Sequence, residues 1–267
     1  MATAVVLGAM KAGTTTLYHD MSNIPGVSRG PKESGLYSRS RGGLVEDPEA
    51  QVTVDFCADY SMAHLFPGVA QRVQEDLGRD VPLVYMLRDP LERLESHLRH
   101  LSSLGKQVRA DALGPDHHVV LTSRYGYQVR QWLEAGHRGL HLVDFHQYSQ
   151  DRVAGLAQVA ELIGAAAPAT WQAGEAQNAS SELRSARPLI RGVVRSTAYQ
   201  RIKPFIPANL RSTLKQTRLT EAADTDITLA PETRKRLRGI FVEDLRELEA
   251  AIPSVPEWVR AYTREGC

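Results

Sequence analysis

The sequence predicts an α/β protein: one domain over residues 1–267, with a central parallel sheet flanked by helices. Three observations favour this class. A short apolar run, Ala4 to Leu7, leads through a glycine-rich turn into a helix. A second unit of this kind follows, in which the apolar run Val81 to Met86 precedes a helix starting near Pro90. Apolar runs of strand length alternate with helix-period segments along the chain, which is typical of parallel sheets.

The first strand-to-helix turn has the composition of a phosphate-binding loop. Gly8 and Gly13 give the Gly-x-x-x-x-Gly spacing of nucleotide-hydrolysing enzymes, so the domain is P-loop-like. Backbone N–H groups at the start of the following helix can hold a phosphate, and Lys11 adds a cation. Thr14 stands where a Walker loop has its lysine, which favours a 5′-phosphate group over a triphosphate. The alternative is an ordinary glycine-rich turn.

Each further element has a local signal. Val52 to Phe56 alternates apolar and polar residues, as a half-buried strand does. Asp89 suits an N-cap and Pro90 the first turn of a helix, while Gly164 suits a helix C-terminus. The expected strands cover 4–7, 25–30, 52–56, 81–86 and 140–145, and the expected helices 14–21, 61–77, 90–101, 122–133, 148–163 and 231–252.

Composition excludes several classes of protein. The formal net charge of +1 argues against a general nucleic-acid binder. The two cysteines, Cys57 and Cys267, form neither a disulfide framework nor a metal site, and they suit a reducing cytoplasm. We expect no signal peptide, because the N-terminus lacks a charged region and has only a short apolar run. No apolar run approaches membrane-spanning length.

Two motifs resemble those of sulfotransferases that use 3′-phosphoadenosine-5′-phosphosulfate (PAPS), namely the heparan-sulfate-type and related bacterial enzymes. Lys11-Ala12-Gly13-Thr14-Thr15 is similar to their 5′-phosphosulfate loop, which implies donor contacts from Lys11 through Thr16. The resemblance gives Lys11 a catalytic role as well. The stretch Arg88-Asp89-Pro90-Leu91-Glu92-Arg93-Leu94-Glu95-Ser96 is similar to their 3′-phosphate motif, which implies that Arg88 and Ser96 hold that phosphate. The alternative is a surface arginine and a mid-helix serine.

Acceptor-side residues follow from the same resemblance. Lys32-Glu33, with Tyr37 after it, is similar to a Lys-Glu motif whose glutamate is the catalytic base; by itself the pair would suit a solvated loop. Asp59 and Tyr60 end a stretch similar to Glu-Lys-Ser-Ala-Asn-Tyr of the heparan-type enzymes, although its lysine and serine are missing here. Lys32, Asp59 and Tyr60 are therefore expected acceptor contacts. Capping of a helix is the alternative for Asp59 and for Asp55.

His97 and His100 lie three residues apart on the helix that carries Ser96. A catalytic or metal-binding pair is one interpretation, but no third ligand is evident. We expect His97 to line the acceptor pocket and predict no metal.

A basic segment, residues 184–218, contains nine Arg or Lys residues and no acidic residue. Arg187 starts a four-residue repeat that would follow one face of a helix. Three interpretations compete: a lid over the nucleotide phosphates, a surface for an anionic membrane or lipid-like acceptor, and a solvated helix. The resemblance favours the lid, with Arg184 or Arg187 on the 3′-phosphate.

The sequence therefore predicts a cytoplasmic PAPS-dependent sulfotransferase that modifies a hydroxyl or amine of a small-molecule, sugar or lipid-like acceptor. One alternative is a P-loop nucleotide or small-molecule kinase, with Asp55 as its magnesium ligand. Another is a nucleotide-binding or membrane-docking module that is not an enzyme. The loops over 39–51 and 106–119 are expected to shape the acceptor pocket.

Overall fold

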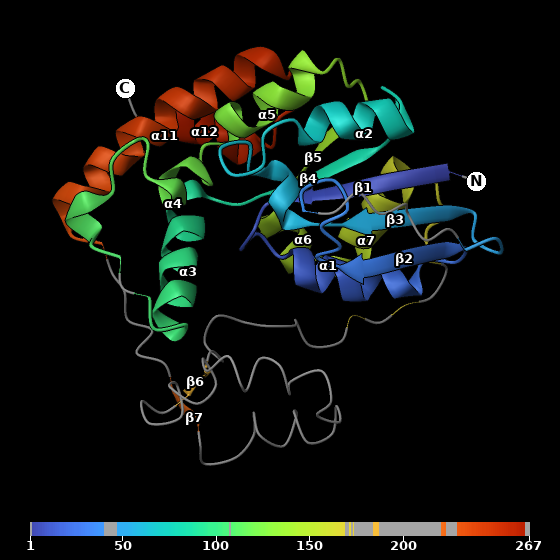
Figure 1. The fold of residues 1–267 in the computed structure, drawn as a ribbon, viewed down its shortest axis with the longest axis horizontal. Coiled ribbons are helices and arrows are strands. Elements are labelled where there is room, and N and C mark those ends of the chain that lie inside the picture. The colour runs from blue at the N-terminus through green and yellow to red at the C-terminus, as the bar shows by residue number, and fades with distance from the viewer. Residues whose placement is uncertain are drawn as a thin grey trace.

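A computed structural model describes residues 2–39, 47–106, 108–168, 171, 173 and 229–264, together with the backbone of the short strands at 184–186 and 220–222. Its centre is the five-stranded parallel sheet that the sequence predicts (Figure 1). The strands are β1 Ala2–Gly8, β2 Val27–Lys32, β3 Val52–Phe56, β4 Leu83–Leu87 and β5 Leu140–Asp144.

The strand order, β2-β3-β1-β4-β5, determines where a ligand can bind. The chain leaves β1 toward β2 on one side and returns to β4 on the other side of β1. The order therefore reverses between β1 and β4, and ligands of open α/β sheets bind at the carboxyl ends of strands beside such a point. Both strands are almost wholly buried, because their apolar residues meet helices on both faces of the sheet.

Helices cover both faces of the sheet, with α2, α5 and α11 on one face and α1 and α7 on the other (Figure 1). The α-helices are α1 Thr14–Asp20, α2 Val69–Leu77, α3 Pro90–Ser103, α4 His118–Leu121, α5 Tyr125–Glu134, α6 Phe145–Gln150, α7 Arg152–Leu162, α11 Pro231–Ala251 and α12 Glu257–Arg264. Short 3-10 turns occur at Met21–Asn23, Ala58–Ser61 and Ala110–Ala112. The expected helices beginning at residues 14, 90 and 231 are confirmed.

The expected helix over 61–77 is wrong in its first half. The chain forms a 3-10 turn at Ala58–Ser61 and enters α2 only at Val69. Pro67 and Gly68 separate the two pieces, and Gly68 has a left-handed backbone (φ 75°) that a continuous helix excludes. Local apolar periodicity did not reveal this break.

Two other expected helices differ from the structure. The helix expected over 122–133 begins three residues later, as α5 at Tyr125, because a turn over residues 122–124 separates it from α4, which ends at Leu121. The region 148–163 is divided at Asp151, whose carboxylate accepts the Ala154 N–H at 3.0 Å and so starts a new helix. The strand expected over 140–145 ends at Asp144, so that Phe145 starts α6 instead.

The first residues of the basic segment belong to a strand. Residues Arg184–Ala186 form strand β6, which pairs antiparallel with β7 Thr220–Ala222. The expected arginine-lined helical face over 187–195 lies outside the described residues.

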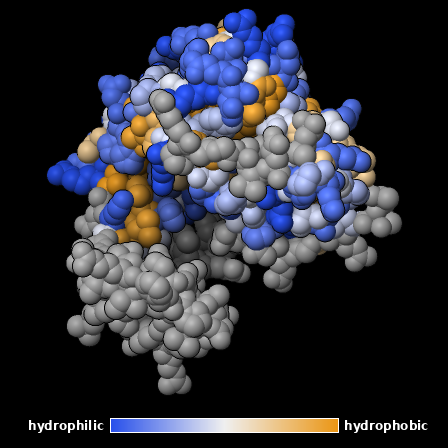
Figure 2. Space-filling view, turned by 45° about the vertical axis from the view of Figure 1, so that its right-hand side comes forward, coloured by the Kyte–Doolittle hydropathy of each residue, from blue (hydrophilic) through white to orange (hydrophobic). Residues whose placement is uncertain are grey.

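None of the helices in the described residues is long and apolar enough to cross a bilayer. Figure 2 shows a mostly hydrophilic face with hydrophobic side chains in small separate patches. The large apolar side chains that are exposed, among the described residues, are scattered over different elements: Leu65, Leu104, Leu133 and Val153.

A buried carboxylate joins α11 to α5. Asp244 is 1% exposed and accepts the backbone N–H groups of Gly126 and Tyr127 at 2.8 and 2.9 Å. Burial raises the pKa of Asp244 to about 6, while the two N–H groups and the nearby Arg124 guanidinium act in the opposite direction. A Cβ at Gly126 would lie 2.3 Å from the Asp244 carbonyl oxygen, so the two helices pack backbone to backbone.

We predict that Asp244→Ala lowers the free energy of unfolding by about 2–5 kcal/mol, because two buried N–H groups lose their acceptor. Denaturant unfolding would measure this change. The matched control is Glu247→Ala one turn along α11, where an exposed pair with Arg130 is removed. We expect that control to change stability by less than about 0.5 kcal/mol. Equal effects of the two variants would contradict the anchoring role.

Candidate active site

The loop between β1 and α1 is held in a conformation that faces the carboxyl edge of the sheet. The Ala9 N–H donates to the Met86 carbonyl at 2.9 Å, which attaches the loop to β4. Lys11 and Gly13 both have left-handed backbones, with φ of 71° and 81°. A Cβ at position 13 would lie 2.5 Å from the Phe145 ring, so only glycine fits there.

The remaining loop positions match the expected arrangement of a strand, a glycine-bracketed turn and a helix. Ala12 is buried and its N–H closes a turn on the Ala9 carbonyl at 3.1 Å. Thr14 and Thr16 are buried in the first turn of α1, and Thr15 between them is partly exposed. Helix α1 therefore begins three residues after Lys11, at Thr14.

Positive charge is concentrated around this loop. Burial lowers the pKa of the Lys11 ammonium, and four further cations close to it act in the same direction. These cations are Arg88, Arg93, Arg99 and Lys32. No carboxylate of the described chain forms an ion pair with Lys11. An electropositive site of this kind favours an anionic ligand. Sequence analysis assigned no role to Arg99, because this residue lies outside both motifs.

Arg93 is a second residue whose function the sequence did not reveal. It is fully buried, and its partners are the Ser123 hydroxyl at 2.5 Å and the carbonyls of Val119 and Met10 at 2.9 and 3.3 Å. Burial lowers the pKa of this guanidinium to about 10. Because Met10 belongs to the loop between β1 and α1, Arg93 attaches that loop to α3. The position of Arg93 within the Arg-x-Pro-x-x-Arg motif is the signal that could have pointed to it.

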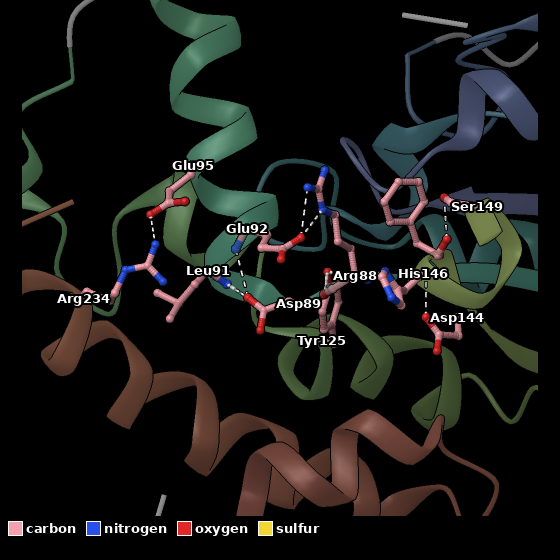
Figure 3. Close-up of polar contacts among 11 residues, drawn as sticks. Arg88, Asp89, Leu91, Glu92, Glu95, Tyr125, Asp144, His146, Ser149 and Arg234 are labelled. Atoms are coloured by element: carbon pink, nitrogen blue, oxygen red, sulfur yellow. Dashed lines mark hydrogen bonds and ion pairs between the residues drawn. The ribbon is translucent and has the colours of Figure 1, made fainter. Parts of the chain in front are cut away.

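Arg88 lies at the carboxyl end of β4, where the sequence placed it. Its Nε and Nη2 atoms contact one carboxylate oxygen of Glu92 at 3.1 and 3.0 Å (Figure 3). The Arg88 guanidinium lies 5.0 Å from the centre of the Phe145 ring. The Asp89 carboxylate accepts the N–H groups of Leu91 and Glu92, which confirms its expected N-cap position. This cap fixes the start of α3 next to the arginine.

Ser96 is buried on α3, two turns beyond Arg88. Arg88 precedes α3, and Glu92 in the first turn of α3 contacts the Arg88 guanidinium at 3.0 Å. The Glu92 side chain is 58% exposed, whereas Ser96, four residues further on, is 2% exposed. The shared phosphate contact expected of Arg88 and Ser96 stays a prediction.

Glu33 lies at the carboxyl ends of β2 and β3. One carboxylate oxygen contacts the Lys32 ammonium at 2.8 Å, and the other accepts the Ala58 N–H at 2.9 Å. Its backbone is left-handed (φ 59°), which turns the side chain out of the strand direction. The Glu33 side chain is 46% exposed, so a bound molecule can reach the carboxylate. Lys32 is the last residue of β2, two residues beyond the expected end of this strand at residue 30.

Tyr60 and Asp55 form a buried network behind Glu33. The Tyr60 hydroxyl donates to the Asp55 carboxylate at 2.6 Å and accepts the Tyr37 N–H at 3.3 Å. Both side chains are buried, so they stabilise the loop that follows Glu33 and do not face an open surface. Asp59 instead pairs with Arg39 at 2.6 Å. Neither Asp55 nor Asp59 caps a long helix.

His97 is buried on the face of α3 that approaches Lys11. It is 5% exposed, its Nδ1 atom has no partner within the described ranges, and its ring centre lies 6.1 Å from that of His118. Burial, with smaller contributions from nearby cations and histidines, lowers the pKa of His97 to about 2. The imidazole is therefore neutral in the folded protein. The described residues contain no group of three His, Cys, Asp or Glu side chains arranged for a metal ion.

The sequence matches no model of a known protein family and none of the curated proteins. Its structure is similar to the crystal structure of a sulfotransferase from Alicyclobacillus acidocaldarius, with a TM-score of 0.64 and 17% sequence identity over 97% of this chain and 99% of that one. The chain has a sulfotransferase fold. Only the backbone of Arg184 is described, and Arg187 lies outside the described residues. The contact expected between one of these arginines and the 3′-phosphate therefore stays a prediction.

The buried histidines of this fold predict acid sensitivity. The unfolded chain protonates His97 near its ordinary pKa of 6.5, whereas the folded protein holds it neutral down to about pH 2. The free energy of unfolding should therefore fall as the pH drops below about 6.5. His97→Gln should reduce the loss of thermal stability between pH 7.5 and 5.5. Exposed His19→Gln is the control, and an unchanged pH dependence in both variants would contradict the assignment.

Proposed function

We propose that the protein is a PAPS-dependent sulfotransferase. The observation that carries the proposal is the concentration of cations around Lys11, next to a glycine-bracketed loop and to Arg88, in a chain with a sulfotransferase fold. PAPS has two anionic ends, a 5′-phosphosulfate and a 3′-phosphate. The loop suits the first end and the start of α3 the second.

Donor binding would use the loop and the start of α3 described above. The N–H groups of residues 12–16 and the Lys11 ammonium would hold the 5′-phosphosulfate. Arg88 and Ser96 would hold the 3′-phosphate, after the Arg88 guanidinium has moved from Glu92 to the ligand. Arg184 or Arg187 would close over the same phosphate if residues 184–218 form a lid.

Transfer would proceed by attack of an acceptor oxygen or nitrogen on the sulfur atom. The new bond to sulfur forms as the bond to the bridging oxygen breaks, and that electron pair leaves with adenosine 3′,5′-bisphosphate. The acceptor proton goes to the Glu33 carboxylate, which is accessible and held in place by Ala58. Lys11 offsets the negative charge that grows on the leaving oxygen.

The acceptor would be a small-molecule, sugar or lipid-like hydroxyl or amine. Lys32 and Asp59 lie near Glu33 at the edge of the sheet, and the neutral His97 lies on the Lys11 side. Tyr60 would act indirectly, because its buried hydroxyl holds the loop that follows the base. The membrane-docking interpretation of residues 184–218 stays a prediction beside the lid.

The kinase alternative has less support. It requires a magnesium-binding carboxylate at a strand end, and Asp55 is 1% exposed and bonded to the Tyr60 hydroxyl.

The decisive experiment is incubation with PAPS and a panel of phenols, sugars and lipids, followed by mass spectrometry. We expect one added sulfonate on at least one acceptor class. Binding of the nucleotide without turnover on any acceptor would favour a binding module instead.

Nucleotide selectivity provides a first quantitative prediction. Adenosine 3′,5′-bisphosphate should bind more tightly than AMP by about 1.5–3 kcal/mol, because Arg88 forms a charge-assisted contact with the 3′-phosphate. Calorimetry with Arg88→Ala should show this preference lost, and Arg138→Ala on the surface should leave it intact. Glu92→Gln should tighten bisphosphate binding, since the carboxylate no longer competes for Arg88. Equal affinity for the two nucleotides would refute the assignment.

Variants of Glu33 and Lys11 should have different kinetic effects. Glu33→Gln removes the base and should slow transfer to weakly acidic alcohols about 10²–10⁴-fold, with little change in nucleotide affinity. The loss should shrink for acidic phenols, which are already ionised. Lys11→Ala should slow transfer to every acceptor and weaken PAPS binding as well. Exposed Glu134→Gln is the control; full activity of Glu33→Gln on an alcohol would place the base elsewhere.

A further inference from the structure

A buried carboxylate that the proposed reaction does not use lies at the end of helix α1. Asp20 is the last residue of this seven-residue helix, and it is buried. A carboxylate is unfavourable at this end, because the helix dipole leaves the last turn partly negative. A helix this short is also only marginally stable by itself. Contacts with other elements must therefore compensate the Asp20 charge and hold α1 in place.

Helices α6 and α7 supply that compensation. The Arg152 Nε atom donates to one Asp20 oxygen at 2.9 Å, and its Nη2 atom donates to the other oxygen. The Tyr148 hydroxyl donates to the same carboxylate at 2.6 Å. Arg152 begins α7 and Tyr148 belongs to α6, so the three residues, which we call the Asp20 network, join three helices. A two-pronged contact between a guanidinium and a carboxylate is both strong and geometrically specific.

The Tyr148 ring is held toward Asp20 by the backbone of α7. A Cβ at Gly155 would lie 2.6 Å from this ring, so the ring packs directly on the glycine. Burial, followed by the hydrogen bond to Asp20, raises the pKa of the Tyr148 phenol. The hydroxyl therefore keeps its proton and stays a donor to the carboxylate.

The Asp20 network and the loop between β1 and α1 lie at opposite ends of α1. Phe145, the first residue of α6, packs on Gly13, directly before α1 begins. Tyr148 lies three residues further along α6 and contacts Asp20 at the other end of α1. Helices α1 and α6 therefore touch at two points, one beside the loop and one at the network. A shift of α1 at the network would move Gly13 against the Phe145 ring.

We propose that Asp20 is a positioning residue for donor binding: its contacts with Tyr148 and Arg152 hold α1 against α6 and keep the loop ordered before a ligand arrives. This inference rests on the proposed function, which assigns the 5′-phosphosulfate of PAPS to that loop. A loop that is ordered only part of the time binds its ligand more weakly by that fraction, whereas the filled site keeps its rate. The network therefore acts on donor affinity rather than on the chemical step.

The first test is steady-state kinetics of Asp20→Asn with an acceptor that the parent protein modifies. Asparagine keeps the size of the side chain and removes the charge that Arg152 compensates. The KM for PAPS should rise about 10- to 100-fold, while kcat at saturating PAPS should fall less than about threefold. A merely structural role would lower the folded fraction, and so the apparent kcat, with the KM unchanged. Tyr148→Phe removes one hydroxyl and should raise the KM by a smaller factor.

Asp76→Asn is the matched control. Its carboxylate also accepts a tyrosine hydroxyl, that of Tyr37, but it belongs to α2 on the other face of the sheet from α1 (Figure 1). This variant should keep the parent's KM for PAPS, and thermal melts show that each variant is folded. An unchanged KM in folded Asp20→Asn and Tyr148→Phe, or an equal rise in Asp76→Asn, would overturn the proposal.

Amide hydrogen exchange tests the network without PAPS or an acceptor. The Ala9 N–H donates to the Met86 carbonyl and the Ala12 N–H to the Ala9 carbonyl, so both amides report on the order of the loop. Both should lose protection in Asp20→Asn and keep it in the control. Unchanged protection at both amides would also overturn the proposal. A parent protein that transfers no sulfonate would refute the proposed function instead, and loss of protection in Asp20→Asn would still support the ordering of the loop by Asp20.

Discussion

The structure depends on a cluster of positive charge held at the carboxyl edge of a parallel sheet. Arg93 is its buried part, and its partners are a hydroxyl and two carbonyl oxygens rather than a carboxylate. A guanidinium buried in this way leaves its charge uncompensated by the protein, so the nearby loop stays electropositive. Because one of those carbonyls belongs to Met10, the same contact also positions the loop against α3.

The carboxylates near this cluster are kept apart from its centre. Glu92 contacts Arg88 at one end of α3, and Glu33 contacts Lys32 across the edge of the sheet. Lys11 has neither as a partner. An anionic ligand at the loop would therefore meet an ammonium that is already partly desolvated, and burial strengthens such an interaction. This arrangement provides electrostatic preorganisation before any ligand is bound.

A rigid support stands behind the proposed base. Tyr60 connects the Asp55 carboxylate at the end of β3 with the backbone at Tyr37, and Ala58 donates to Glu33 itself. On the opposite side, Phe145 packs on Gly13 and lies under Arg88. Both supports come from segments distant in sequence from the groups they position. They keep Glu33 and the loop around Gly13 in fixed places on the sheet.

The sequence by itself determined the α/β class, the glycine-bracketed turn after β1 and the helix start at Pro90, because these depend on local signals. Glycine spacing, an Asp-Pro helix start and buried apolar runs act within a few residues. Helix breaks at Gly68 and Asp151 were missed, since apolar periodicity continues through both. Only the tertiary structure decided that Arg93 binds the loop, that Phe145 reaches Gly13, and that Arg152 reaches Asp20 at the end of α1. Those contacts join residues far apart in the chain, and their distances follow from strand order and helix packing, which no local pattern encodes.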